Sequence, residues 1–163
     1  MPGAKSVVRA HDGTLFVPGG CLWAINENGE QLWRMQLADD GAGLPKLSAD
    51  EKTLYVVSTT HLYAIDTARG VLRWSVSNPC YLLLQECTPQ ALSGGKVAIE
   101  TVADRGGKAG SSGLEYQVRV VGAGGKEVWS RDAKSTIDML CRPGHRCLSC
   151  AVTTVWRFWT QAE

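Results

Sequence analysis

Residues 62–74 read LYAIDTARGVLRW, and they are the best preserved copy of a pattern that occurs three times in the chain. An earlier copy, residues 22–33, reads LWAINENGEQLW, and a later one, residues 118–129, reads VRVVGAGGKEVW. Each copy ends in Trp. A unit that recurs at a period of about 40 residues is typical of repeat proteins, in which each unit buries its apolar face only by packing against its neighbours.

Each copy belongs to a longer unit that predicts four short strands separated by turn-sized segments. No separator holds the ten or more helical residues that a parallel crossover would need, so an α/β fold is excluded. Residues 103–113 are rich in Gly and Ser and are expected to be an inserted loop. The expected strands are 6–10, 14–18, 21–26 and 30–36, then 44–48, 53–58, 61–66 and 71–76, and finally 87–92, 96–102, 114–121 and 126–130.

Four-stranded units of this length are the blades of radial propellers. The fold class that we predict is therefore all-β: a β-propeller fragment of about three four-stranded antiparallel blades plus a partial fourth. The remainder is expected to be a divergent tail rich in Cys and Trp. The predicted segments are blades 5–36, 44–77 and 87–131, a partial blade 135–140, and the tail 141–163.

Composition and charge limit the classes of partner. Lys and Arg number 17 against 16 Asp and Glu, so the formal charge of +1 provides no field to attract nucleic acid. No run approaches the roughly 20 apolar residues that span a bilayer, and the amino terminus lacks the apolar core of a signal peptide. We expect a soluble chain that binds neither nucleic acid nor a membrane by a spanning helix.

The segment from Ala64 through Asp66 and Gly70 to Trp74 resembles the tryptophan-docking repeat of the PQQ-like β-propellers, the quinoprotein dehydrogenase superfamily. That repeat is A-x-D-x-x-x-G-K-x-x-W, and only Val71 departs from it here. The first copy keeps Ala, Gly and Trp and has Asn for Asp, whereas the third keeps only Gly, Lys and Trp. The resemblance covers about residues 5 to 131.

The resemblance implies a structural role for the repeat residues. A Trp at the end of the outermost strand presents a flat face that can stack on the next blade, and a small Ala in the preceding strand leaves room for that approach. The residues expected to dock blades in this way are Ala24, Asn26, Gly29, Trp33, Ala64, Asp66, Gly70, Trp74, Gly125 and Trp129.

Three blades and part of a fourth are fewer than the roughly four to eight of a closed propeller. Enzymes of the superfamily hold their quinone and Ca²⁺ on the axis of a complete ring, so the resemblance predicts here a non-enzymatic protein-interaction scaffold without catalytic residues or cofactor. Its partner would be another protein or a second copy, bound through open blade edges. The alternative is a fragment of a PQQ- and calcium-dependent quinoprotein dehydrogenase.

The candidate carboxylates Asp12, Asp39, Asp40, Asp50 and Asp104 all lie in predicted turns, where solvated side chains are expected.

One cluster has the composition of a metal site. Cys141, His145, Cys147 and Cys150 lie within ten residues, and tetrahedral zinc takes four such ligands. The spacing from Cys147 to Cys150 is that of a usual half-site, but no second pair with this spacing exists. The other interpretation is that these residues belong to the divergent tail, and we predict no metal.

Overall fold

The computed structural model of the chain describes residues 7–38, 43–78, 88–104 and 114–133. The predicted partial blade 135–140, the tail 141–163 and the candidate zinc ligands in that tail lie outside these residues, as do Asp39 and Asp40. The predicted boundaries at 140 and 141 therefore stay predictions.

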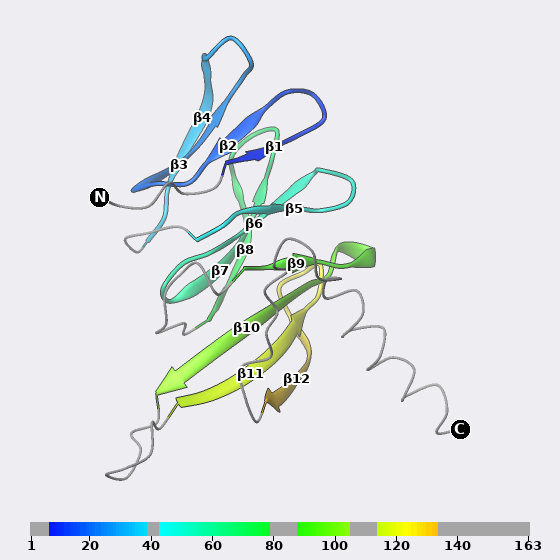
Figure 1. The fold of residues 1–163 in the computed structure, drawn as a ribbon. Helices are drawn as coiled ribbons and strands as arrows, with labels where there is room; N and C mark the ends of the chain where they lie inside the picture. Colours follow the sequence, from blue (N-terminus) through cyan, green and yellow to red (C-terminus); the bar gives the residue numbers. More distant parts are fainter. Residues whose placement is uncertain (1–6, 39–42, 79–87, 105–113, 134–163) are drawn as a thin grey trace, which may run out of the picture. The chain divides into compact units, whose positions relative to one another are not determined.

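The described residues form three sheets of four strands each, and within each sheet every strand pairs with the one before it in sequence. Figure 1 shows the three sheets in turn, from blue through green to yellow. The strands are β1 Val8–Arg9, β2 Leu15–Val17, β3 Cys21–Ile25 and β4 Gln31–Gln36, then β5 Lys46–Leu47, β6 Thr53–Val57, β7 His61–Asp66 and β8 Leu72–Ser77, and finally β9 Gln90–Ala91, β10 Val97–Asp104, β11 Leu114–Val121 and β12 Glu127–Ala133.

This architecture confirms the predicted fold class. Each of the twelve expected strands overlaps an observed one, and the only helical element among the described residues is a 3₁₀ turn at Ser93–Gly95. One expectation was wrong. Ala103 and Asp104 were placed in the inserted loop, but β10 continues to Asp104, and these two residues pair with Glu115 and Leu114. The ladder continues past the point where the Gly-rich composition begins, because each further pair adds backbone hydrogen bonds.

The hairpins β3–β4 and β7–β8 are built alike. In both, the ladder shifts register directly after the Ala of the repeat, between Ala24 and Ile25 and between Ala64 and Ile65. The turn glycines that follow have positive φ angles of 83° at Gly29 and 65° at Gly70, a conformation that residues with a Cβ adopt only at a cost. The recurring Gly of the repeat is thus required by the turn.

The core consists of two clusters, one on each face of the second sheet. Leu54, Val56 and Ile65 pack with the first sheet, whereas Tyr55, Val57, Leu62 and Ala64 pack with the third. The second sheet is therefore buried on both faces, and β6 shows no alternation of exposed and buried residues. In β3 of the first sheet, buried residues alternate with half-buried ones. No helix in the part of the chain that the structure describes is long and apolar enough to cross a membrane.

Candidate functional site

The Ala and Trp of the repeat are cross-strand partners. Ala24 pairs with Trp33 and, in the second sheet, Ala64 pairs with Trp74. On the second strand of each of these two sheets, an aromatic residue pairs with the same Ala from its other side. The ring of this aromatic residue lies close to the ring of the Trp. The ring centroids of Phe16 and Trp33 are 5.8 Å apart, and those of Tyr55 and Trp74 are 6.0 Å apart.

The small Ala explains this geometry. With only a methyl group between the two aromatic residues, their rings approach across the middle strand at a tilted angle, the arrangement that aromatic pairs favour. We had expected the Ala to leave room for the neighbouring blade. In the structure it leaves room for an aromatic residue of its own sheet.

Trp33 contacts the turn of the second sheet. Its indole Nε1 donates a hydrogen bond of 2.7 Å to the backbone carbonyl oxygen of Thr67. A Cβ added at Gly70 would lie 2.6 Å from Cε3 and 2.7 Å from Cγ of the indole, and it would also contact Cδ2. The ring therefore lies directly on a glycine that has no room for a side chain.

The same contact recurs between the second and third sheets. Trp74 donates from Nε1 to the carbonyl oxygen of Ala123 at 2.7 Å, and a Cβ at Gly125 would lie 3.0 Å from Cγ of this indole. Thr67 and Ala123 are each the second residue of their turn, directly after Asp66 and Gly122. The Trp of one repeat thus meets the Gly and a backbone carbonyl of the next repeat twice in this chain.

Further hydrogen bonds join neighbouring sheets. The backbone N–H of His11 donates to Oε2 of Glu51 at 2.9 Å, which links the first and second sheets. Between the second and third sheets, the hydroxyl of Tyr55 donates to the carbonyl oxygen of Gly95 at 2.9 Å, and Arg119 Nη1 donates to the carbonyl oxygen of Ser77 at 2.8 Å. The hydrogen bonds of Trp33 and Trp74 are therefore two of several that join neighbouring sheets.

The third residue of the motif shapes the turn. Asp66 accepts the backbone N–H of Arg69 at 3.0 Å and pairs with the guanidinium groups of Arg69 and Arg73 at 3.2 and 2.9 Å. These hydrogen bonds, that of Arg69 first, hold the pKa of the Asp66 carboxyl well below its ordinary value of 3.8. Asn26 replaces this carboxylate in the first sheet and accepts the N–H groups of Asn28 and Glu30 instead.

The lowered pKa makes the stability of the chain depend on pH. The ionised Asp66 stabilises the folded chain above the pKa of the unfolded state, near 3.8, and this contribution is lost as the pH falls through the folded-state pKa. We expect the urea midpoint of Asp66→Asn to vary less with pH below about 4 than that of the unchanged chain. Parallel pH profiles for the two proteins would contradict this role.

The structure brings seven of the ten predicted residues into the two contacts and their turns, but Trp129 lies apart from them, as do Asn26 and Gly29, which share the turn of the first sheet. Apart from its chain neighbours, no described residue has an atom within 4 Å of a Cβ built at Gly29, and Trp129 is 36% exposed, against 9% for Trp33. Sequence analysis missed Phe16, Tyr55 and the two carbonyl groups. The signal for the aromatics was present, because Leu15-Phe16-Val17 and Leu54-Tyr55-Val56 repeat at the same place in their units.

The carboxylates outside the motif have structural partners. Hydrogen bonds from Thr14 lower the pKa of Asp12, and a hydrogen bond from the Ser48 hydroxyl lowers that of Asp50. Both Asp residues lie in turns and are exposed, as expected. Within the described ranges, no group of three or more His, Cys, Asp or Glu side chains is arranged to hold a metal ion.

Comparison with known proteins gives one family match. The model of the family described as "Outer membrane protein assembly factor BamB" matches residues 2–138. No curated protein matches the sequence.

Solved structures share the fold at low sequence identity. BamB from Moraxella catarrhalis has a TM-score of 0.60 and 17% identity, over 83% of this chain and 40% of that one. A Bacteroides caccae protein of unknown function gives 0.57 and 15%, over 82% and 51%. The quinohemoprotein alcohol dehydrogenase ADHIIG from Pseudomonas putida HK5 gives 0.53 and 18%, over 91% and 23%.

The chain spans about half or less of each of these structures. The family match covers most of the chain, and the three four-stranded sheets agree with it. The chain therefore belongs to the PQQ-like repeat β-propeller family that is represented by the outer membrane protein assembly factor BamB.

Proposed function

We propose that this chain is a non-enzymatic scaffold that binds other proteins through the surfaces of its blades. The observation that carries the proposal is the outward face of the first sheet, on the side away from the second. Leu15, Val17, Trp23 and Ile25 lie on that face, and all four are only partly buried. Partly exposed apolar side chains gathered on one sheet face are typical of a protein contact.

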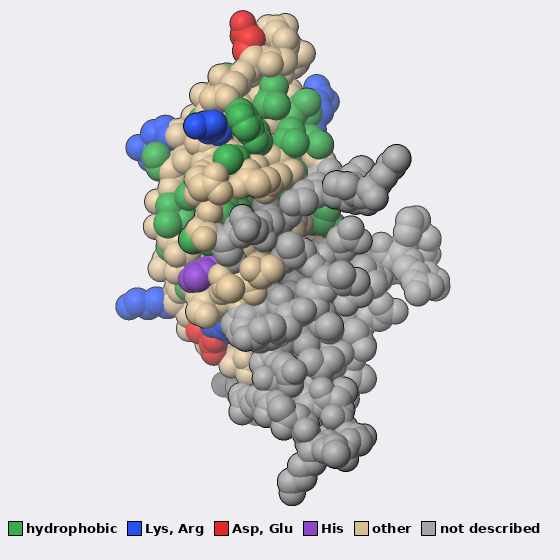
Figure 2. Space-filling model, turned by 90° about the vertical axis from the view of Figure 1, so that its left-hand side faces the viewer, with side chains coloured by type: hydrophobic (Ala, Val, Ile, Leu, Met, Phe, Trp, Pro, Cys, Tyr) green, Lys and Arg blue, Asp and Glu red, His purple; other side chains and the backbone are tan. Residues whose placement is uncertain are grey.

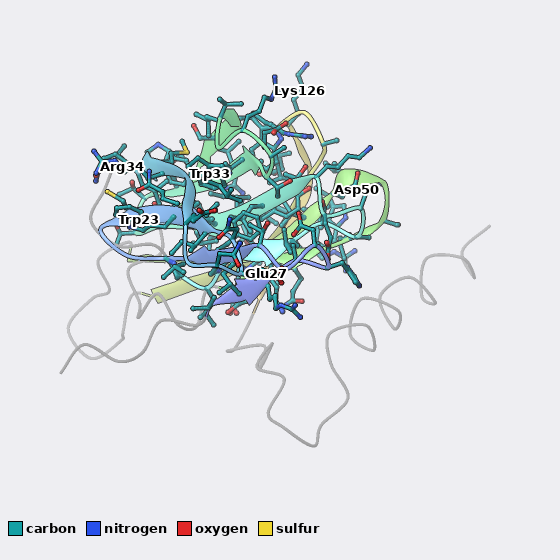
Figure 3. All side chains as sticks on the ribbon, turned by 90° about the horizontal axis from the view of Figure 1, so that it is seen from above. Trp23, Glu27, Trp33, Arg34, Asp50 and Lys126 are labelled. Carbon is teal, nitrogen blue, oxygen red and sulfur yellow. The ribbon has the colours of Figure 1, made fainter. Side chains whose placement is uncertain are left out.

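Trp23 is the largest of these side chains. Its ring lies 5.8 Å from the guanidinium carbon of Arg34, its partner on β4, and Figure 3 shows the two side by side, with Trp33 further in. Aromatic residues and Arg are enriched where proteins bind one another. The face drawn in Figure 2 likewise shows hydrophobic side chains among isolated charges of both signs.

The carboxylates support a structural role over a catalytic one. A general acid or base near neutral pH needs a pKa close to the working pH, which for a carboxyl group requires an upward shift. The pKa values of Asp12, Asp50, Asp66 and Glu127 are all lowered, the last by hydrogen bonds from Ser130 and Arg119. These four groups stay ionised and stabilise turns and hairpins.

Within this scaffold, the ten repeat residues would join blade to blade and bind no ligand. The family description "assembly factor" agrees with a role in holding proteins together. The competing function is that of a quinoprotein dehydrogenase fragment, which has the same fold.

Ligand-induced stabilisation separates the two functions. A ligand at 100 times its dissociation constant stabilises a protein by about 2.7 kcal/mol, which raises the melting temperature by several degrees. We expect pyrroloquinoline quinone with Ca²⁺ to leave the melting temperature of the full chain unchanged. A rise that needs both quinone and Ca²⁺ would overturn the scaffold proposal.

Residue-specific crosslinking tests the surface itself. With benzoylphenylalanine in place of Val17, we expect irradiation of cells that make the full chain to yield one discrete protein adduct, identified by mass spectrometry. The same adduct should weaken when Trp23 is replaced by Lys. Benzoylphenylalanine at the exposed turn residue Ala68 is the control. Equal adducts from positions 17 and 68 would show that the outward face has no special role.

A further inference from the structure

The outward face of the first sheet has the composition of a blade interface. Leu15, Val17, Trp23 and Ile25 correspond in register to Leu54, Val56, Tyr63 and Ile65 of the second sheet, because Phe16 and Tyr55 occupy the same row. All four residues of the second sheet are buried, and they pack in one cluster with the first sheet. The first sheet thus presents the kind of face that, one unit later, is covered by a preceding blade.

The turn beside this face is already in the conformation that accepts a Trp. Gly29 has φ +83° and donates its N–H to the carbonyl oxygen of Asn26 at 3.0 Å. Gly125, on which Trp74 lies, has φ +78° and donates to Gly122 at 3.0 Å. Both turns have the same length, so the carbonyl of Glu27 takes the position that the carbonyl of Ala123 has in the observed contact.

The side chain that would dock on this turn lies on β12, the last described strand. Trp129 and its neighbour Val128 on β12 are 36% and 52% exposed. The third sheet has no aromatic residue at the position that Phe16 and Tyr55 hold in the first two sheets. Ala98 stands there instead and pairs with Val120, and both side chains are buried. Among the side chains of this sheet that the structure describes, the exposed large apolar ones are Val128 and Trp129, both on the outer strand.

We propose that Trp129 of one copy of this chain docks on the Gly29 turn of a second copy and donates its indole N–H to the carbonyl oxygen of Glu27. The proposal rests on the proposed scaffold function and names the partner as a second copy. The contact is head-to-tail, so two copies can make it twice around a two-fold axis.

Complementary variants test this contact. We expect the full chain to sediment with twice its 17.6 kDa mass. Trp129→Ala removes the indole, and Gly29→Ala places a Cβ where the indole would lie, so each variant alone should be a monomer. Truncation of a central aromatic residue of an interface should raise the dissociation constant about 30-fold or more. Mixed one to one, the two variants retain one complete contact and should form a heterodimer.

The mixture distinguishes a lost contact from lost folding, because a misfolded variant cannot be rescued by its complement. Circular dichroism of each variant should match that of the unchanged chain. A monomer at all concentrations, or a dimer unaffected by either variant, would overturn the proposal.

A crosslinker at the contact gives an independent result. Benzoylphenylalanine in place of Trp129 should join two chains through residues 26–30, as read from the crosslinked peptide. An adduct to residues 134–163 of the same chain would show that Trp129 is covered intramolecularly, and would overturn the proposal. A monomeric chain whose position 17 still captures another protein would refute the second copy but leave the scaffold function intact. Stabilisation by quinone and Ca²⁺ would refute both.

Discussion

Replacing Gly70 with Ala should destabilise the folded chain by about 2 to 5 kcal/mol, as read from the urea midpoint at pH 7. Two costs combine. The φ angle of +65° disfavours any residue with a Cβ by about 1 to 2 kcal/mol. The new methyl group would also lie 2.6 Å from Cε3 of Trp33, so the indole must leave the position in which it packs and donates to Thr67.

Gly94→Ala separates these two costs. Gly94 has φ +68°, almost the same as Gly70, but a Cβ there has no atom of the described residues within 4 Å except those of its chain neighbours. We expect this variant to lose only the strain, about 1 to 2 kcal/mol. Equal losses in the two variants would mean that the close approach of Trp33 to the turn contributes nothing to stability.

The repeat pattern predicted most of the fold because its spacing is set by hairpin geometry. A period of two along the strands places Ala24 opposite Trp33 and Ala64 opposite Trp74, and the Gly between them supplies the positive φ of the turn. The one extra residue in the second turn lengthens the loop and leaves this pairing unchanged. Strand number and order therefore follow from local sequence.

The contacts between sheets were less predictable. The indole N–H groups donate to the backbone carbonyls of Thr67 and Ala123, and a carbonyl group leaves no trace in residue identity. Thr and Ala can share the position because the indole N–H groups bond only to their main-chain carbonyl oxygens. The burial of both faces of the second sheet depends on the sheets on either side of it, which no single strand encodes.

Replacing Trp33 with Ala should cost about 3 to 5 kcal/mol, the usual loss for a large buried aromatic residue. Trp33 is 9% exposed and contacts Phe16 of its own sheet as well as the turn of the next. Its loss leaves a cavity between two sheets that share a core cluster, and neither sheet can close it without moving the other. Trp129→Ala, at a 36% exposed position, should cost far less when measured at concentrations where the chain is monomeric.

Trp33→Phe divides this loss into its parts. Phe keeps an aromatic ring against Phe16 but removes the N–H, so the carbonyl of Thr67 loses its partner at a cost of about 1 kcal/mol. A double-mutant cycle then tests whether Trp33 and Gly70 act together. Where Trp33 is already Ala, the methyl group of Gly70→Ala has no indole to displace, and its cost should fall to the strain that Gly94→Ala measures. If Gly70→Ala costs as much in that background as in the unchanged chain, the glycine matters only for its turn, and the Trp contact with it is incidental.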